Sequence, residues 1–262
     1  MRSRCCHSVK AAGEIGVSSP RLKTSGVSVE SPYRHPNTSV TTKPGIETAQ
    51  RGAPVVDPKI GAIAPSRVSF PVVAMAASVG GLKALSVILG GLPGDFPGAI
   101  AIVMHLSPDH KSILAEILSN RTSLPVKQAH TGDQLCPSTV LIAPPNHHLM
   151  VAAGGRVKLS SSAAKKVHYA RPSAEPLFIS VAAVYKSNAI AVVLTGGDGD
   201  GSFGVQIIKE QGGRVIAQDR PTSQDFSMPE TSIKTGDVDF ILPLNEIAPK
   251  LMELVGQTGT NQ

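Results

Sequence analysis

Hydrophobic and polar positions over residues 69–257 alternate between two patterns. Short runs of aliphatic, often β-branched residues are followed by longer stretches with an apolar residue at every third or fourth position. The short runs are typical of strands buried on both faces, and the longer stretches are typical of amphipathic helices. Strands are expected at 72–76, 99–104, 126–128, 140–143, 190–194, 215–217 and 240–242. Helices are expected between them, at 81–92, 111–119, 174–185, 201–210 and 244–255.

This alternation predicts an α/β fold with a mainly parallel, doubly wound (Rossmann-like) sheet and flanking helices. One segment has a different pattern. The apolar runs 149–151 and 157–159 are separated by Ala153, Gly154 and Gly155, which predicts a small β-hairpin. A parallel sheet brings the carboxyl ends of its strands to one edge, which is where folds of this class bind ligands.

The N-terminal quarter of the chain has neither pattern. Residues 1–68 are rich in Ser, Thr, Pro, Gly, Lys and Arg. Such a segment cannot bury enough apolar surface to offset its loss of conformational entropy, so we expect a disordered basic tail. One folded domain is therefore expected over 69–257, followed by a short C-terminal tail at 258–262.

The net charge of +6 belongs to the tail. Residues 1–70 carry ten Lys and Arg against four Asp and Glu, whereas residues 71–262 carry fifteen of each. A neutral folded part argues against a nucleic-acid-binding protein. No run approaches the roughly 18 apolar residues of a membrane span, and the first thirty residues lack the apolar centre of a signal peptide. The three cysteines form no even framework, so reduced thiols, a cytoplasmic location and no membrane insertion are expected.

Polar side chains follow three of the expected strands. Ser78 follows the first strand, and His105 follows the second. Asp198 and Asp200 follow the strand at 190–194. A hydroxyl, an imidazole and a carboxylate at one sheet edge form the set needed for nucleophilic acyl transfer. Each also has a structural interpretation, namely a helix N-cap for the serine, a simple hydrogen-bonding role for the histidine and a turn for the acidic pair.

Two ligand-binding patterns are excluded. A calcium loop that begins at Asp198 needs glycine at its sixth position and glutamate at its twelfth, where the chain has Phe203 and Lys209. A G-x-G-x-x-G dinucleotide loop needs glycine at positions 76, 78 and 81, of which only Gly81 matches. The histidines show no spacing typical of metal ligands. We therefore expect neither a cofactor nor a metal.

Six segments, in order, resemble the catalytic domain of the CheB-type chemotaxis receptor methylesterases. Within them, A-A-S-V-G-G-L is similar to the family's nucleophile loop, in which G-A-S-x-G-G is usual. The segment L-T-G-G-D-G-D-G is similar to the family's acid loop, L-T-G-x-G-x-D-G. The resemblance extends over about residues 70–256. The six segments are 76–82, 104–108, 143–148, 171–178, 194–201 and 227–229.

The resemblance implies hydrolysis of glutamate γ-methyl esters, and often deamidation of glutamine, on the cytoplasmic helices of chemoreceptors. It implies that Ser78 is the nucleophile, that His105 is the base, and that Asp200 rather than Asp198 orients the base. It also places the oxyanion donors among backbone N–H groups of the two loops. The residues in question are Val79 and Gly197, with Gly80 and Gly196 in support.

Three departures from the family pattern matter. Ala76 and Gly197 stand where glycine and methionine are usual, and Glu175 stands where aspartate is usual. These departures keep open a second hypothesis, a catalytically degenerate module of the same fold that binds receptors or their kinase. Hydrolysis of an unrelated ester or amide is a third. Because residues 1–68 lack strand–helix alternation, we expect no phosphoacceptor receiver domain in this chain.

Overall fold

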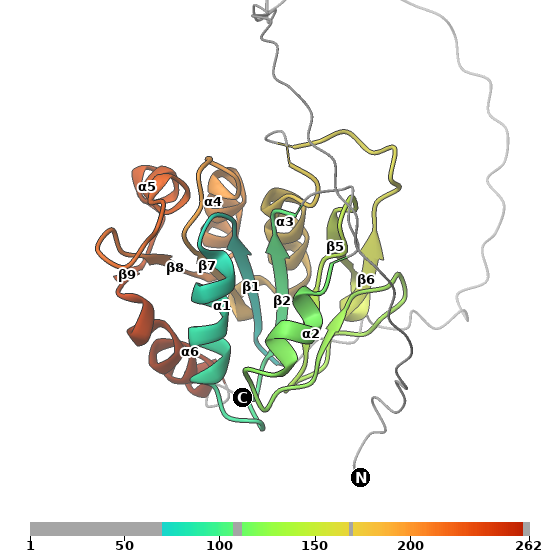
Figure 1. Cartoon of the computed structure of the whole chain (residues 1–262), viewed down its shortest axis with the longest axis horizontal. Coiled ribbons are helices and arrows are strands. Elements are labelled where there is room, and N and C mark those ends of the chain that lie inside the picture. The colour runs from blue at the N-terminus through green and yellow to red at the C-terminus, as the bar shows by residue number, and fades with distance from the viewer. Residues whose placement is uncertain (1–69, 107–111, 168–169, 259–262) are drawn as a thin grey trace, which may run out of the picture. The chain divides into compact units, whose positions relative to one another are not determined.

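The computed structural model describes residues 70–106, 112–167 and 170–258. The tail expected at 1–68 lies outside the described residues, as do residues 259–262. The main sheet is parallel throughout and has seven strands, which confirms the predicted α/β fold (Figure 1). Its strands are β1 (Val72–Ala77), β2 (Ala99–Met104), β3 (Val126–Gln128), β4 (Val140–Ile142), β7 (Ala189–Val193), β8 (Arg214–Gln218) and β9 (Phe240–Leu242).

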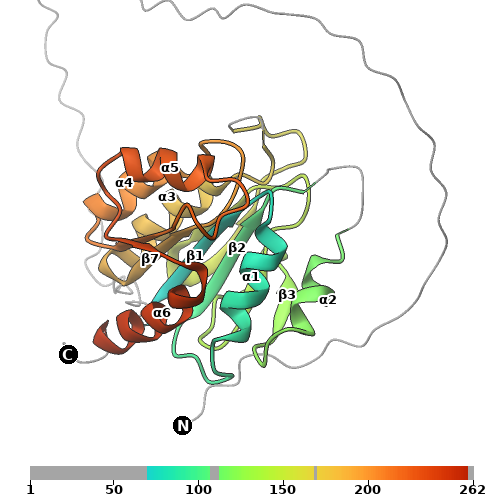
Figure 2. The same ribbon diagram turned by 60° about the vertical axis from the view of Figure 1, so that its left-hand side comes forward.

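Helices cover both faces of this sheet (Figure 2). One face is covered by α1 (Gly81–Gly90), α2 (Leu114–Ser119) and α6 (Leu244–Thr258). The other is covered by α3 (Ala174–Tyr185), α4 (Ser202–Glu210) and α5 (Ser227–Lys234). Strand β1 is fully buried, and its alternate side chains enter the two apolar layers, as a strand period of two requires.

The predicted hairpin is also present. Strands β5 (Leu149–Ala152) and β6 (Arg156–Leu159) pair antiparallel through a short turn at Ala153–Gly155. In that turn Gly154 and Gly155 have φ of 74° and 80°, a region that glycine enters without steric cost. The hairpin packs beside α3, where the Val151 N–H donates to Ser180 Oγ at 2.9 Å.

The strand order places the site. The sheet runs β3-β4-β2-β1-β7-β8-β9, so β2 and β7 lie on opposite sides of β1. The strand order therefore reverses at β1, and a crevice opens at the carboxyl ends of the strands at such a switch point. In the register, Ala77 is opposite Met104, and Ala76 is opposite Val193. The residues that follow β1, β2 and β7 consequently meet at one edge.

Two helices differ most from the prediction. The helix expected at 111–119 begins at Leu114, whose N–H donates to Ser112 Oγ at 3.1 Å. Helix α5 was not predicted, because its sequence is mostly polar and it buries only Met228, Pro229 and Ser232. Pro229 lies in the first turn, where its missing N–H costs no helical hydrogen bond. A short helix with so few buried positions has too weak a hydrophobic periodicity to be predicted from its sequence.

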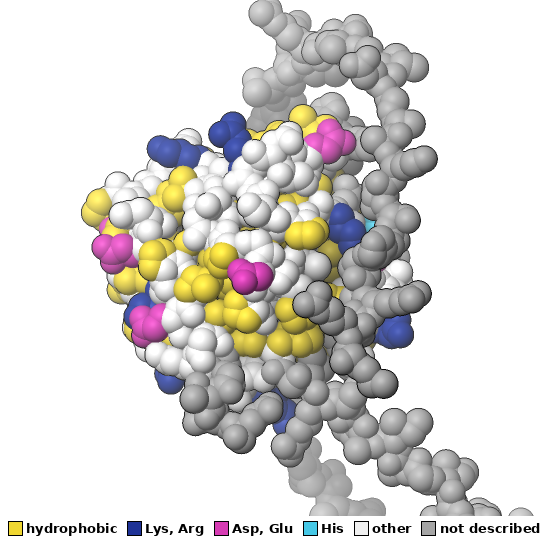
Figure 3. All heavy atoms as spheres, turned by 90° about the horizontal axis from the view of Figure 1, so that it is seen from below, with side chains coloured by type: hydrophobic (Ala, Val, Ile, Leu, Met, Phe, Trp, Pro, Cys, Tyr) yellow, Lys and Arg dark blue, Asp and Glu magenta, His cyan; other side chains and the backbone are white. Residues whose placement is uncertain are grey.

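Charged side chains are scattered over the face of the molecule that is turned toward the viewer in Figure 3. In Figure 3, which views the molecule from below Figure 1, basic and acidic side chains stand singly among hydrophobic and uncharged ones. This distribution agrees with the equal numbers of acidic and basic residues over 71–262. Within the described ranges, no helix has both the length and the apolar character that crossing a bilayer requires.

Candidate active site

Strand β1 ends in a tight turn that carries Ser78. The Ser78 N–H donates to Thr195 O at 3.0 Å, and the Gly81 N–H donates to Ser78 O at 2.9 Å. Gly80 has φ of 79° and is itself the N-cap of α1, without a side-chain capping bond. The N-cap interpretation of Ser78 is therefore wrong. The Ser78 side chain is partly exposed and makes no hydrogen bond within the part of the chain that the structure describes.

The alanine at position 76 does not disturb this turn. Ala76 is fully buried in β1 and is paired with Val103 on one side and Val193 on the other. The close approach lies instead at Gly81, where an added Cβ would stand 2.7 Å from Ala77 Cβ. Glycine is required at position 81, whereas alanine fits at position 76.

His105 lies beside the serine at the end of β2. Its N–H donates to Ala77 O at 3.1 Å, which continues the β1–β2 ladder and places His105 opposite Ser78. The imidazole is held by two carboxylates of the loop after β7. Nε2 is 2.8 Å from Asp200 Oδ2, and Nδ1 is 3.2 Å from Asp198 Oδ2. The structure thus brings Ser78, His105 and Asp200 to one edge, and it adds Asp198.

The two carboxylates determine the charge of the imidazole. Burial lowers the pKa of His105, but the hydrogen bonds and charges of Asp198 and Asp200 outweigh this and raise the pKa from 6.5 to about 9. At neutral pH the side chain is therefore an imidazolium. A general base must be neutral, so the arrangement favours catalysis at alkaline pH.

Asp200 is fully buried at the N-terminus of α3. Its Oδ1 accepts from Ser173 Oγ at 2.6 Å, and its Oδ2 accepts from the Ala174 N–H at 2.6 Å. Ser173 is the N-cap of α3, and its Oγ also accepts from the Glu175 N–H. A carboxylate at a helix N-terminus interacts favourably with the helix dipole. These donors fix the carboxylate, which in turn fixes the imidazole.

Glu175 makes the reciprocal contact. It lies in the first turn of α3, and its carboxylate accepts from the N–H groups of Phe203 and Gly204 in the first turn of α4, at 3.0 and 2.5 Å. Asp200, which precedes α4, binds the N-terminus of α3 in the same manner. The N-terminus of α3 is thus bound by the carboxylate that precedes α4, and the N-terminus of α4 is bound by a carboxylate of α3.

We expect Glu175→Gln to destabilise the fold. The amide retains one acceptor oxygen, so one buried N–H of α4 loses its partner. The free energy of unfolding should fall by about 1–3 kcal/mol, measured by denaturant titration. Glu210→Gln, at the exposed C-terminal end of α4, is the matched control and should change it by less than about 0.5 kcal/mol. Equal stability of the two variants would contradict the role of Glu175.

Two loops supply candidate oxyanion donors. Val79 and Gly197 are exposed, and their N–H groups have no hydrogen-bond partner among the described residues. Thr195 Oγ1 lies 2.8 Å from Val79 O and accepts from the Asp225 N–H at 2.9 Å, which ties the nucleophile loop to the acid loop. The two N–H groups are therefore held on connected loops at the edge that carries Ser78.

Gly196 lies so close to Ser78 that there is no room for a side chain at position 196. An added Cβ would lie 2.9 Å from Ser78 Cβ and would overlap Met228 Sδ. We expect Gly196→Ala to displace Ser78 and to reduce kcat by about 100-fold, because small misplacements of a reacting group are that costly. Gly256→Ala in α6 is the control, since an added Cβ there meets nothing within 4 Å. Steady-state kinetics of both variants test this, and unchanged kcat in Gly196→Ala would contradict it.

Comparison with known proteins identifies the family. The family model described as CheB methylesterase matches residues 73–251. The chain belongs to the CheB methylesterase family. The match includes β1, β2, β7 and the loops that follow them. The likeness inferred from six short segments is therefore confirmed over nearly the whole folded part.

Individual methylesterases are similar to this chain in sequence, and one is similar to it in structure. A protein-glutamate methylesterase/protein-glutamine glutaminase 2 of Anaeromyxobacter dehalogenans is 42% identical over 192 residues, which cover 73% of this chain and 55% of that protein. The protein-glutamate methylesterase FrzG of Myxococcus xanthus is 39% identical, with 71% and 55% covered. The crystal structure of the Thermotoga maritima CheB methylesterase catalytic domain superposes with a TM-score of 0.68 at 38% identity, covering 72% of this chain and all of that one. The chain spans about half the length of the curated relatives it matches.

Two residues of the candidate site in this member of the CheB methylesterase family were not predicted, and a third was predicted only as an alternative. Asp198 was considered only as an alternative to Asp200, yet both contact the imidazole. His148 is buried, and its Nδ1 accepts from the Ser173 N–H at 3.2 Å while its Nε2 donates to Lys165 O at 2.9 Å. His148 and Ser173 lie in two of the six segments that resemble the family, which is the signal that points to them.

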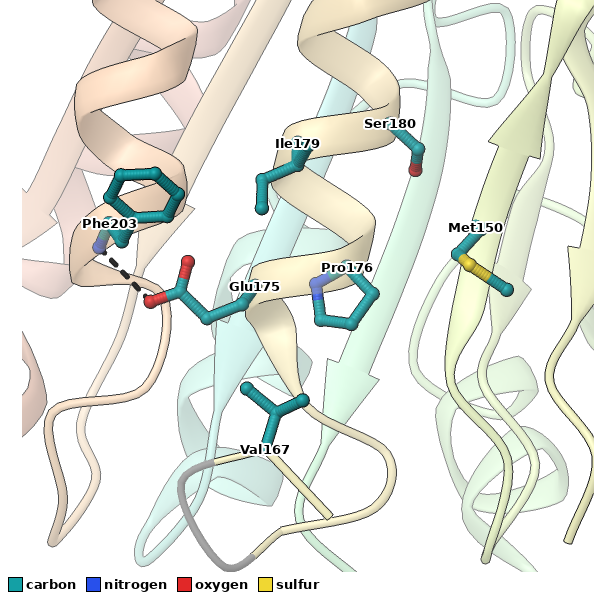
Figure 4. Close-up of a pocket in the computed structure, with 7 residues that line it drawn as sticks. All are labelled: Met150, Val167, Glu175, Pro176, Ile179, Ser180 and Phe203. Carbon is teal, nitrogen blue, oxygen red and sulfur yellow. Dashed lines mark hydrogen bonds between the residues drawn. The ribbon is translucent and has the colours of Figure 1, made fainter. Parts of the chain in front are cut away.

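A separate hollow of about 600 Å³ lies between β5, α3 and α4 (Figure 4). Glu175 lies between the hollow and the site, because its carboxylate accepts from the Phe203 N–H at the hollow, while its own N–H donates to Ser173 Oγ, which holds Asp200. The His, Cys, Asp and Glu side chains of the described residues form no group of three suited to a metal ion. The residues that line the hollow are Met150, Val167, Glu175, Pro176, Ile179, Ser180 and Phe203.

Proposed function

We propose that this chain is a protein-glutamate methylesterase that hydrolyses glutamate γ-methyl esters on the cytoplasmic helices of chemoreceptors. The observation that carries the proposal is the meeting of Ser78, His105 and Asp200 at the carboxyl ends of β1, β2 and the β7 loop. The names of the relatives support the same reaction, and they support deamidation of glutamine at the same site.

The reaction follows from this geometry. Neutral His105 accepts the proton of Ser78 Oγ at the ring nitrogen that Asp200 does not hold, and Oγ attacks the ester carbonyl. The negative charge that forms on the carbonyl oxygen is stabilised by the N–H groups of Val79 and Gly197. His105 returns the proton to the leaving methoxide, which departs as methanol. Water, activated by the same histidine, then hydrolyses the acyl-enzyme and releases the glutamate side chain.

The test uses the full chain and a chemoreceptor cytoplasmic fragment carrying radiolabelled methyl esters. We expect release of labelled methanol, with the rate increasing from pH 7 to pH 9. Small aryl esters serve as a second substrate. Turnover of these esters without methanol release from the receptor would overturn the proposal in favour of an unrelated esterase.

A second candidate function is a receptor-binding module without activity. It is favoured by one observation: at neutral pH His105 is charged, and Ser78 has no hydrogen bond to it within the described ranges. A serine-reactive phosphonate, applied at pH 9 where about half of the His105 side chains are neutral, separates the two. Labelling of Ser78 supports the methylesterase, and a folded protein without label supports the module.

A further inference from the structure

The imidazole of His105 has a carboxylate on each of its nitrogens. Asp200 Oδ2 lies 2.8 Å from Nε2, and Asp198 Oδ2 lies 3.2 Å from Nδ1. A neutral imidazole has one N–H and one lone pair, so it can donate to only one of two carboxylates. Both contacts are satisfied together only by the imidazolium. The geometry therefore selects the charged form of the ring.

Asp198 also occupies the nitrogen that the reaction needs. Because Nε2 is bound to Asp200, the proton of Ser78 must go to Nδ1, and Asp198 is hydrogen-bonded there. Asp198 competes with Ser78 for this atom. As long as the contact persists, His105 has no lone pair to offer.

Asp198 is placed for this contact by its own loop. Its Oδ1 accepts from the Asp200 N–H at 3.1 Å, an Asx-type turn that directs Oδ2 to the imidazole. Its side chain is 36% exposed, whereas that of Asp200 is fully buried. Asp200 is thus a fixed partner, and Asp198 is a partner that an incoming group is able to displace.

This second carboxylate departs from the acid-loop pattern that the segment resembles. The pattern L-T-G-x-G-x-D-G has glycine at the position where this chain has Asp198, and a glycine has no side chain with which to contact the ring. We propose that Asp198 is a positioning residue that holds His105 in a protonated resting form and competes with Ser78 for Nδ1. The proposal rests on the proposed function, in which His105 is the base.

Two carboxylates supply the charges that act on the ring. Asp198 and Asp200 are the charged groups of the described residues that act on His105. The neighbouring Ser78 of the β1 turn is uncharged, and the α3 N-terminus acts through Asp200. Asp225 is a third carboxylate, and it interacts with Asp198 rather than with the ring. Removing the charge of Asp198 therefore changes one of two direct contacts.

The test compares Asp198→Asn with the wild type by NMR titration of His105 and by the pH profile of kcat/KM. An asparagine keeps an acceptor for the Asp200 N–H and removes the negative charge that favours the imidazolium. We expect the pKa of His105 to fall by about 1–3 units and the profile to shift by the same amount. At pH 7 kcat/KM should then rise by about tenfold for a fall of one unit, and by at most about 100-fold, because the ring is almost entirely neutral once its pKa lies below 7. Asp95→Asn, an exposed carboxylate that follows α1, is the charge-matched control and should shift neither.

The outcomes are separable from those of the proposed function. An unchanged pKa of His105 in Asp198→Asn overturns the proposal, and so does a lowered pKa with an unshifted pH profile. If neither protein releases methanol, the methylesterase assignment fails, and the NMR titration still decides what Asp198 does to the ring. Asp198→Gly provides a second variant if the asparagine variant does not fold, and the same pKa shift is expected from it.

Discussion

Ser78→Ala is expected to reduce methanol release by about four to six orders of magnitude, since the loss of a nucleophile removes the covalent route altogether. The effect should appear in kcat, with KM little changed, because the hydroxyl contributes to the reacting state rather than to binding. The fold should be unaffected. Ser78 Oγ makes no hydrogen bond among the described residues, and the turn is held by backbone bonds that alanine preserves.

The control for this variant lies eight residues further along the chain. Ser86 is in α1, and its Oγ donates to Leu82 O on the exposed side of the helix. Ser86→Ala should keep wild-type activity and wild-type labelling by the phosphonate, whereas Ser78→Ala should lose both. Equal thermal melting of the three proteins would show that activity and folding have been separated. Substantial activity in Ser78→Ala would mean that another group attacks the ester.

Asp200→Asn is expected to reduce kcat by about 10³–10⁴-fold at every pH, with a lower melting temperature. The carboxylate accepts from His105, Ser173 and Ala174, and an amide supplies only one acceptor oxygen for these donors. The loss has two parts. The imidazole is no longer held in a productive orientation, and a buried N–H or O–H at the start of α3 is left without a partner.

Comparison with Asp198→Asn makes this prediction specific. The two aspartates are separated by one residue, and both contact the same ring, yet their substitutions should change activity at pH 7 in opposite directions. Kinetics of both variants between pH 6 and pH 10, alongside thermal melting, would measure the contrast. If both variants lost activity equally at all pH values, the two carboxylates would have the same role, contrary to the assignment of Asp200 as the orienting acid.

The sequence pattern predicted the sheet well because its central strands β1, β2, β4 and β7 are buried on both faces. β2 and the helix α3 have the predicted bounds, since each is a continuous apolar or periodic segment with a clear boundary, such as the N-cap Ser173. Helix α5 was missed because most of its positions face solvent. The ends of β1, β2 and β7 followed from the strand predictions, and so did the three polar residues behind them.

Side-chain contacts between distant segments could not be predicted from the sequence. Spacing alone treats Asp198 and Asp200 as alternatives, because it does not show which way each side chain of a turn points. Only the folded loop reveals that one is buried by α3 and that the other reaches the opposite side of the imidazole. The same holds for His148, which meets Ser173 across 25 positions of the chain. Ala76 was expected to matter more than it does, because the turn begins after it.

The reciprocal contacts of Glu175 and Asp200 have a consequence for how the protein fails on heating. The group that orients His105 is also a bond at the start of α3, and the residue that binds the start of α4 belongs to α3. Melting of either helix end therefore releases both carboxylates. Thermal inactivation and the unfolding of these helix ends are then a single event. We expect no intermediate in which the site is lost while α3 and α4 remain folded.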